Sequence, residues 1–215
     1  MRIPAWLLAG ALVVMPVAGA EEAVRKPMMI SEAKLPDGFP GPGPVGEVVV
    51  KTYPAHRLAR VRSAGRGGDG SFMRLFRHIE RNEIAMTAPV EMELAGGDDA
   101  ADRMESMAFL YGSSAIGTVG PDPADPDVIV ADVPETTVVS LGVRGSYREE
   151  RFAGFRSRLE AWLGEHPEWI AVGPARTLAY NSPFVPGLLK YAEVQIPIAP
   201  AVRPEPDDPT RPPAP

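Results

Sequence analysis

The sequence contains no cysteine and only three histidines among its 215 residues, and both shortages exclude kinds of site. Without cysteine there is no disulfide framework, no thiolate-ligated zinc or iron–sulfur cluster, no covalent c-type heme attachment and no cysteine nucleophile. A three-histidine metal site would have to use all of His56, His78 and His166. Basic residues are also outnumbered, and the net charge of -6 argues against nucleic acid as a partner.

Proline, in contrast, is in excess, with 25 residues or about 12% against a usual share of about 5%. The first prolines lie in residues 1–20, which have the layout of a secretory signal peptide. Arg2 precedes an apolar stretch from Ala5 to Val17, and small residues at 18–20 offer a cleavage point. The apolar stretch is shorter than the roughly 20 residues that a membrane span needs. We therefore expect a cleaved signal peptide, a periplasmic or secreted protein, and no stable membrane span after cleavage.

Two more proline-rich stretches flank the part of the chain that is expected to fold. Residues 21–44 include the run PGPGP and read as a linker. Residues 199–215 mix proline with charged residues and offer little apolar surface to bury, so we expect a disordered tail rather than a partner-binding proline motif. A single domain at 45–198 remains, and its length suffices for a core of its own.

Apolar periodicity across 45–198 predicts two similar sets of elements, each in the order ββαββ. Helices are expected at 71–81, where apolar residues recur at i, i+3, i+4 and i+7, and at 147–164. The halves share an offset of about 80 residues, with Phe72 paralleling Phe152. We expect an α+β domain in which an antiparallel sheet curls into a distorted β-barrel with two flanking helices. Strands are expected at 47–53, 56–62, 84–94, 104–111, 128–131, 136–143, 175–180 and 191–198.

The strand expected at 84–94 alternates apolar and polar residues over its whole length. Met86 and Met92 fall on the apolar face and are expected in the core, whereas Glu91 and Glu93 fall on a face expected to be solvated. Pro89 lacks an N–H group, which predicts an edge, a break or a bulge at that point.

Residues 72–92, FMRLFRHIERNEIAMTAPVEM, resemble the SOUL heme-binding protein family, whose hallmark is a helix F-x-x-L-x-x-x-I, a short polar loop and then I-x-M-T-A-P-V. Weaker matches follow in the family's order at 50–61, 123–128, 133–134, 180–183 and 193–194. Two features depart from the pattern. The loop at 80–83 looks short, and Gly142-Val143 stand where many relatives carry an Arg-Phe pair.

The resemblance implies a fold related to bacterial effector-binding domains and the binding of heme or another tetrapyrrole in a shallow apolar cleft. That cleft would be formed by the helix at 71–81 and the loop at 181–189. Heme needs apolar surface for its faces and cations for its propionates, and both segments offer such residues. The candidate heme contacts are Met73, Arg77, His78, Phe184, Val185 and Leu188.

Each of these candidates has a simpler structural interpretation. Arg77, with Arg74 and Arg81, also fits a solvated helix face, and the apolar loop also fits closure of the barrel end. His78 and His56 are the candidate iron ligands, although a histidine on a helix flank is commonly a surface residue. The family has no fixed histidine ligand, so we expect apolar burial to dominate and the heme to be held noncovalently.

Two alternatives to a heme-binding, buffering or transport protein stay open. One is a hydrolase of the related effector-binding fold, in which Glu91, Glu93 or Glu193 acts as a general base on a groove wall. The other is a module for a different small ligand or a protein partner. Because no Ser-His-Asp spacing, G-x-S-x-G, HExxH or Walker pattern is present, we expect a binding protein rather than an enzyme.

Overall fold

The computed structural model describes residues 30, 33–63, 70–95, 104–145, 149–182 and 184–201. The expected signal peptide at 1–20, the first part of the expected linker and the tail from 202 lie outside these residues. Among the described helices, none combines the length and the apolar character needed to cross a membrane.

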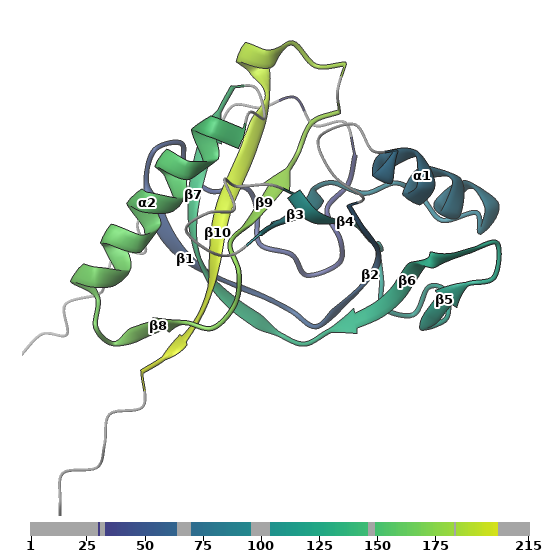
Figure 1. The fold of residues 1–215 in the computed structure, drawn as a ribbon, viewed down its shortest axis with the longest axis horizontal. Helices are drawn as coiled ribbons and strands as arrows, with labels where there is room; N and C mark the ends of the chain where they lie inside the picture. The colour runs from purple at the N-terminus through teal and green to yellow at the C-terminus, as the bar shows by residue number, and fades with distance from the viewer. Residues whose placement is uncertain are drawn as a thin grey trace, which may run out of the picture.

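Ten strands form one antiparallel sheet, with two helices lying against it (Figure 1). The strands pair in the order β1-β7-β10-β9-β3-β4-β2-β6-β5, and β8 pairs with the end of β10. The helices are α1 (Ser71–Arg81) and α2 (Glu149–Glu165), and a 3-10 turn (Gly187–Leu189) precedes the last strand. The strands are β1 (Val48–Tyr53), β2 (His56–Arg62), β3 (Val90–Leu94), β4 (Met104–Leu110), β5 (Gly120–Asp122), β6 (Asp125–Val133), β7 (Thr136–Arg144), β8 (Trp169–Ala171), β9 (Arg176–Ala179) and β10 (Tyr191–Pro200).

The two halves of the sheet repeat each other in strand order. Exchanging β1 with β6, β2 with β7, β3 with β9 and β4 with β10 reproduces the same order, so the fold has an approximate twofold arrangement centred between β3 and β9. This confirms the α+β class and the two ββαββ units expected from the sequence. The expected barrel is too strong a description, because the sheet is not closed and β1 and β5 form its two edges.

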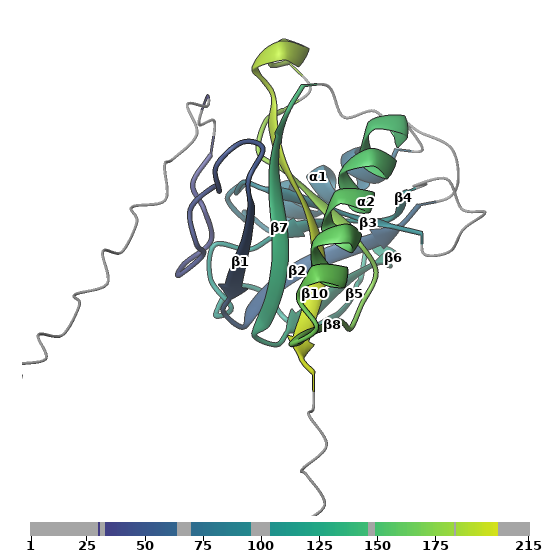
Figure 2. The ribbon, with the colours of Figure 1, turned by 90° about the vertical axis from the view of Figure 1, so that its left-hand side faces the viewer.

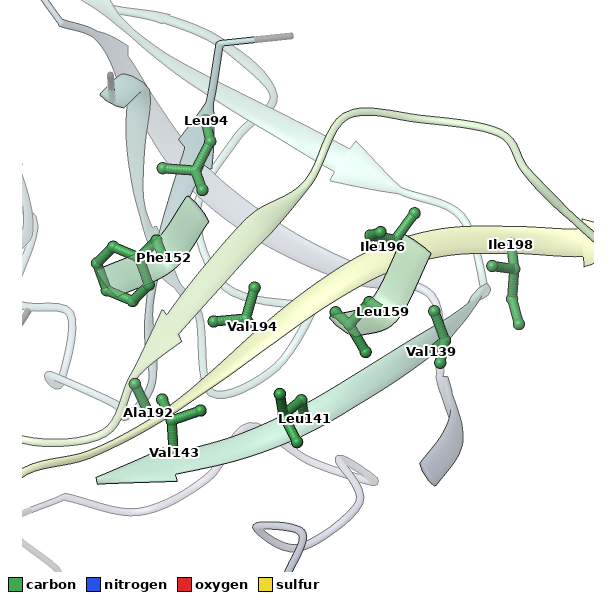
Figure 3. Packing of buried hydrophobic residues seen from close by; sticks show 10 residues of the cluster. All are labelled: Leu94, Val139, Leu141, Val143, Phe152, Leu159, Ala192, Val194, Ile196 and Ile198. Atoms are coloured by element: carbon green, nitrogen blue, oxygen red, sulfur yellow. The ribbon is translucent and has the colours of Figure 1, made fainter. Parts of the chain in front are cut away.

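Both helices cover the same face of the sheet, at its two ends. Residues directly opposite each other in paired strands share a face, and one such row runs Ala192, Ala179, Val90, Phe109. At one end of the row, α2 packs through Phe152 and Leu159 on β7 and β10 (Figure 3). At the other end, α1 packs on β2, β4 and β6. Strands β9 and β3 form the middle of the row, between the part covered by α2 and the part covered by α1.

Helix α1 is rotated relative to the expected apolar stripe. Its buried residues include His78 beside Leu75 and Ile79, whereas Phe76 is more than a third exposed. The inward-facing His78 bonds to a buried carboxylate, Asp122, which compensates for its burial. Periodicity of apolar residues alone does not reveal such a partner.

Strand β3 is shorter than the expected strand at 84–94, and the face that was expected to be solvated is partly buried. It begins at Val90, directly after Pro89, which cannot donate to the ladder. Glu91 is buried, and Met92 lies on the face that the helices share. The expectation of a solvated Glu91 was wrong because ion pairs with Arg60 and Arg176 compensate for its burial.

Residues 33–44 are part of the fold rather than a linker. Leu35 and Phe39 pack against the buried cluster around Tyr53, and the Gly43 N–H donates to Glu193 (2.7 Å). Figure 2 shows this purple segment alongside β1. The composition of 21–44 suggested a linker because the segment is rich in proline and glycine. Composition does not show that two apolar side chains, Leu35 and Phe39, hold the segment on the core.

Candidate functional site

A cleft of about 350 Å³ opens on the helix-covered face, beside the start of α1. It combines residues from the start of α1, the segment before β3, the strands β3, β4 and β9, and the loop before β10. Its lining residues are Ala33, Phe72, Met86, Thr87, Ala88, Val90, Met92, Met107, Ala179, Tyr180, Asn181, Ser182 and Lys190.

The strand register explains the position of this cleft. Ala179 and Val90 are direct partners at the junction of β9 and β3, and Met92 and Met107 are direct partners one row further along. The small Ala179 side chain and the space between the helices leave this part of the sheet uncovered. The cleft therefore lies at the centre of the approximate twofold arrangement.

Three methionines dominate the chemistry of the cleft. Met86 is 36% exposed, and Met92 and Met107 are half-buried beside it. Thioether side chains adapt their shape to apolar ligands and pack well on aromatic rings, and methionine is also an axial ligand in some heme proteins. The cleft is thus suited to a flat, apolar, polarisable molecule.

Polar groups gather at one rim, where β9 leads into the loop before β10. The Asn181 side chain fixes this rim, since its amide donates to the Ile30 carbonyl (2.7 Å) and its oxygen accepts from the Tyr191 N–H (2.8 Å). Lys190, at the other end of the loop, brings a positive charge to the lining. A cation at the rim of an apolar cleft suits a ligand with an anionic substituent.

None of the six heme contacts predicted from the sequence lines this cleft. Met73 and Arg77 lie on the exposed part of α1, and Phe184 and Leu188 project from the loop before β10. Val185 is buried. The predicted segments do contribute to the cleft, but through Phe72, Asn181 and Ser182.

His78 lies inside the protein rather than on a helix surface. Its Nδ1 donates to Asp122, and its Nε2 is 2.6 Å from the Tyr111 hydroxyl. Burial acts to raise the pKa of Asp122, but hydrogen bonds from His78, the Ala124 N–H and Arg81 outweigh it and hold this pKa at about 2. Both ring nitrogens of His78 are therefore engaged in a buried network.

The other two histidines are also held by local contacts. His56 is buried, and its Nδ1 bonds to the Pro54 carbonyl (2.8 Å) while burial lowers its pKa. His166 bonds to the Trp162 carbonyl and stacks on the Trp162 ring. Within the described ranges, no group of three His, Asp or Glu side chains is arranged to hold a metal ion.

The carboxylates considered as general bases lie on the opposite face of the sheet. Glu193 is fully buried and accepts hydrogen bonds from Lys51 (2.6 Å), Ser140 (2.8 Å) and several neighbours. Burial acts to raise the pKa of Glu193, but Lys51 and the surrounding donors outweigh it, so the pKa is lowered. Glu91 is buried between Arg60 and Arg176. These groups hold the sheet together and do not face the cleft.

Comparison with known proteins identifies the family. A family model described as SOUL heme-binding protein matches residues 45–197. The chain belongs to this family. Membership confirms the resemblance seen in the sequence and indicates heme binding for this SOUL protein. A search of curated proteins found no match.

Solved structures resemble this SOUL protein in fold alone. The C-terminal domain of EcmrR is 14% identical with a TM-score of 0.52, and the match covers 72% of this chain and 98% of that domain. EcmrR in its DNA complex is 13% identical with the same TM-score, and the chain spans 58% of its length. An uncharacterized conserved protein from Listeria innocua is 13% identical with a TM-score of 0.51, covering 73% of this chain and 94% of that one.

Proposed function

We propose that this chain is an exported protein that holds heme noncovalently in the cleft beside the start of α1, and that it serves in heme binding, buffering or transport. The observation that carries the proposal is the apolar, methionine-lined cleft with a lysine at its rim. This cleft occurs in a member of the SOUL heme-binding protein family.

The lining residues fit a tetrapyrrole in chemical kind, and the volume fits part of its ring. The floor offers aliphatic, thioether and aromatic groups to a flat apolar ring, and Lys190 offers a cation to a propionate. The volume lies at the lower end of the roughly 300–1,000 Å³ usual for small-molecule sites. We therefore expect heme to enter the cleft with part of the ring and to leave one edge exposed, which suits reversible loading.

An iron ligand, where one is used, would come from a thioether rather than an imidazole. His56 and His78 are buried and hydrogen-bonded away from the cleft, whereas Met86, Met92 and Met107 line it. Bound heme would supply redox and ligand-exchange chemistry, and the chain's own residues would bury its ring and pair with its charge. No cysteine is present to attach it covalently.

Export is supported by the layout of residues 1–20, with its charged start, apolar stretch and small residues before the cleavage point. The N-terminal sequence of the protein recovered from the periplasm or the medium tests this part. A start at or near residue 21 is expected, and an uncleaved chain in the cytoplasmic fraction would contradict it.

The alternatives gain less support from the site. Among the described residues that line the cleft there is no Asp, Glu or His, so the carboxylates proposed as general bases for hydrolysis are not part of it. A smaller apolar ligand fits the modest volume, and this is the second candidate.

Titration with hemin tests the proposed function. We expect a shifted, saturable Soret band with one hemin per chain, and competition by other metalloporphyrins. An uptake without saturation, as for nonspecific adsorption, would reject heme binding. Saturable binding of smaller aromatic molecules without hemin would favour the second candidate.

A further inference from the structure

The loop between β9 and β10 carries two large apolar side chains that are almost completely exposed. Phe184 is 93% exposed and Leu188 is 87% exposed, and Leu189 beside them is about half exposed. These values contradict closure of the barrel end, because neither side chain covers the core. Figures 1 and 2 both show the short yellow-green turn of this loop at an extreme of the molecule.

The loop is held in one shape by local bonds and by an anchor. The Leu189 N–H donates to the Pro186 carbonyl (2.8 Å), the Lys190 N–H to Gly187 (3.2 Å), and the Val185 N–H to Ser182 (3.3 Å). Val185 is buried, so it ties the loop to the body of the protein while its neighbour Phe184 points outward. An exposed apolar tip that is already ordered loses little conformational freedom when it enters an apolar phase.

Three basic residues lie in the segments at the base of this tip. Lys190 follows the turn, the Gly145 N–H donates to the Lys190 carbonyl (3.0 Å), and Arg144 pairs with Tyr191 in the adjoining strand. Arg151 joins this end by donating to the Arg144 carbonyl (2.9 Å). The loop sequence itself contains no acidic residue. The apolar side chains of the tip supply the larger attraction, and the cations supply a smaller one.

We propose that this tip docks the protein on a lipid bilayer, with Phe184, Leu188 and Leu189 inserted at the level of the acyl chains and the cations at the headgroups. A protruding apolar tip enters a fluid bilayer without needing a matching pocket, whereas a protein partner would need one. Positively charged residues behind an apolar tip favour binding to membranes that contain anionic lipids.

Docking in this way would bring the cleft to the lipid surface, because Asn181, Ser182 and Lys190 belong both to the cleft and to the two ends of the loop. This consequence rests on the proposed function, since a membrane-dissolved tetrapyrrole could then pass directly into the cleft. Membrane docking itself does not depend on heme.

Vesicle sedimentation tests the proposal with the protein purified after export and free of hemin, using vesicles of phosphatidylcholine with and without phosphatidylglycerol. The test variant is Phe184→Asp with Leu188→Asp. The control is Val119→Asp with Val172→Asp, which places the same charges on apolar side chains that are 52% and 56% exposed beside β5 and β8. Transfer of one large apolar side chain is worth roughly tenfold in partitioning, so the test variant should bind at least tenfold more weakly than the wild type and the control should not. Phosphatidylglycerol should strengthen wild-type binding only modestly.

Three results would overturn the proposal. The wild type could remain unbound with both vesicles, the tip variant could bind as well as the control, or the tip could mediate a concentration-dependent dimer without vesicles, which would assign it to a second copy. Hemin titration without vesicles is measured on the same samples. Vesicle binding without hemin binding would reject the proposed function and leave the docking proposal standing, and the reverse result would reject the docking alone.

Discussion

Met86→Glu should weaken hemin binding strongly, because it places a carboxylate against the apolar ring that the cleft is proposed to hold. Met86 lines the cleft and is 36% exposed, so the substitution removes little of the protein's own core. Full burial of a methionine side chain is worth about 1.5–3 kcal/mol, and desolvating a carboxylate adds a penalty that solvent at the open edge reduces. A net loss of about 1.5–3 kcal/mol corresponds to roughly a tenfold to hundredfold increase in Kd.

The matched control is Met73→Glu, the same change at a side chain that is 47% exposed on α1 outside the cleft. Hemin affinity is measured from the Soret titration of both variants, and thermal unfolding verifies that both are folded. The control should bind as the wild type does. A large loss with Met73→Glu and none with Met86→Glu would refute the cleft and return the site to the outer surface of α1, where the sequence had suggested it.

Three further predictions concern the surroundings of the cleft. Lys190→Glu should raise the Kd for hemin about fivefold, because reversing a charge at a partly exposed position costs roughly 1 kcal/mol. The Kd for hemin dimethyl ester, which has no free propionates, should stay unchanged. An equal loss of affinity for both ligands would exclude pairing of Lys190 with a propionate. Asp122→Asn should lower the free energy of unfolding by about 3 kcal/mol at neutral pH. The pKa of Asp122 is held at about 2, so the ionised carboxylate stabilises the fold above its ordinary pKa and this stabilisation is lost as the pH falls toward 2. The difference in the free energy of unfolding between the variant and the wild type should therefore shrink in acid. A difference that stays constant with pH in chemical denaturation would contradict this. His78→Gln should lower the melting temperature and leave the Soret position of the hemin complex unchanged, whereas a shifted Soret band would identify His78 as an iron ligand.

Much of the fold could be predicted from the sequence because it depends on local patterns. The two helices, eight of the ten strands in their order along the chain, and the offset between Phe72 and Phe152 follow from apolar periodicity, whereas the short strands β5 and β8 were not expected. The openness of the sheet and the packing of 33–44 could not be predicted in this way. Both depend on which distant strands pair and on single contacts such as that of Phe39 with Tyr53.

The cleft contains residues of the segments suggested by the sequence but none of the six candidate heme contacts. Its position depends on the register that sets Met92 opposite Met107 and Val90 opposite Ala179, and no local pattern encodes that register. Likewise, the buried ion pairs of Glu91 and Glu193 reverse the usual rule that carboxylates face solvent. Met86 and Met92 were expected in the core from their alternation, and only the structure shows that they line the cleft together with Met107.

Methyl NMR of protein labelled on its methionine methyl groups tests the central claim most directly, since it reports where heme lies without any substitution. Paramagnetic hemin should broaden or shift the resonances of Met86, Met92 and Met107, which line the cleft, and leave those of Met73 unchanged. A diamagnetic metalloporphyrin provides the control for structural change. Broadening of Met73 with undisturbed cleft methionines would contradict the proposed site.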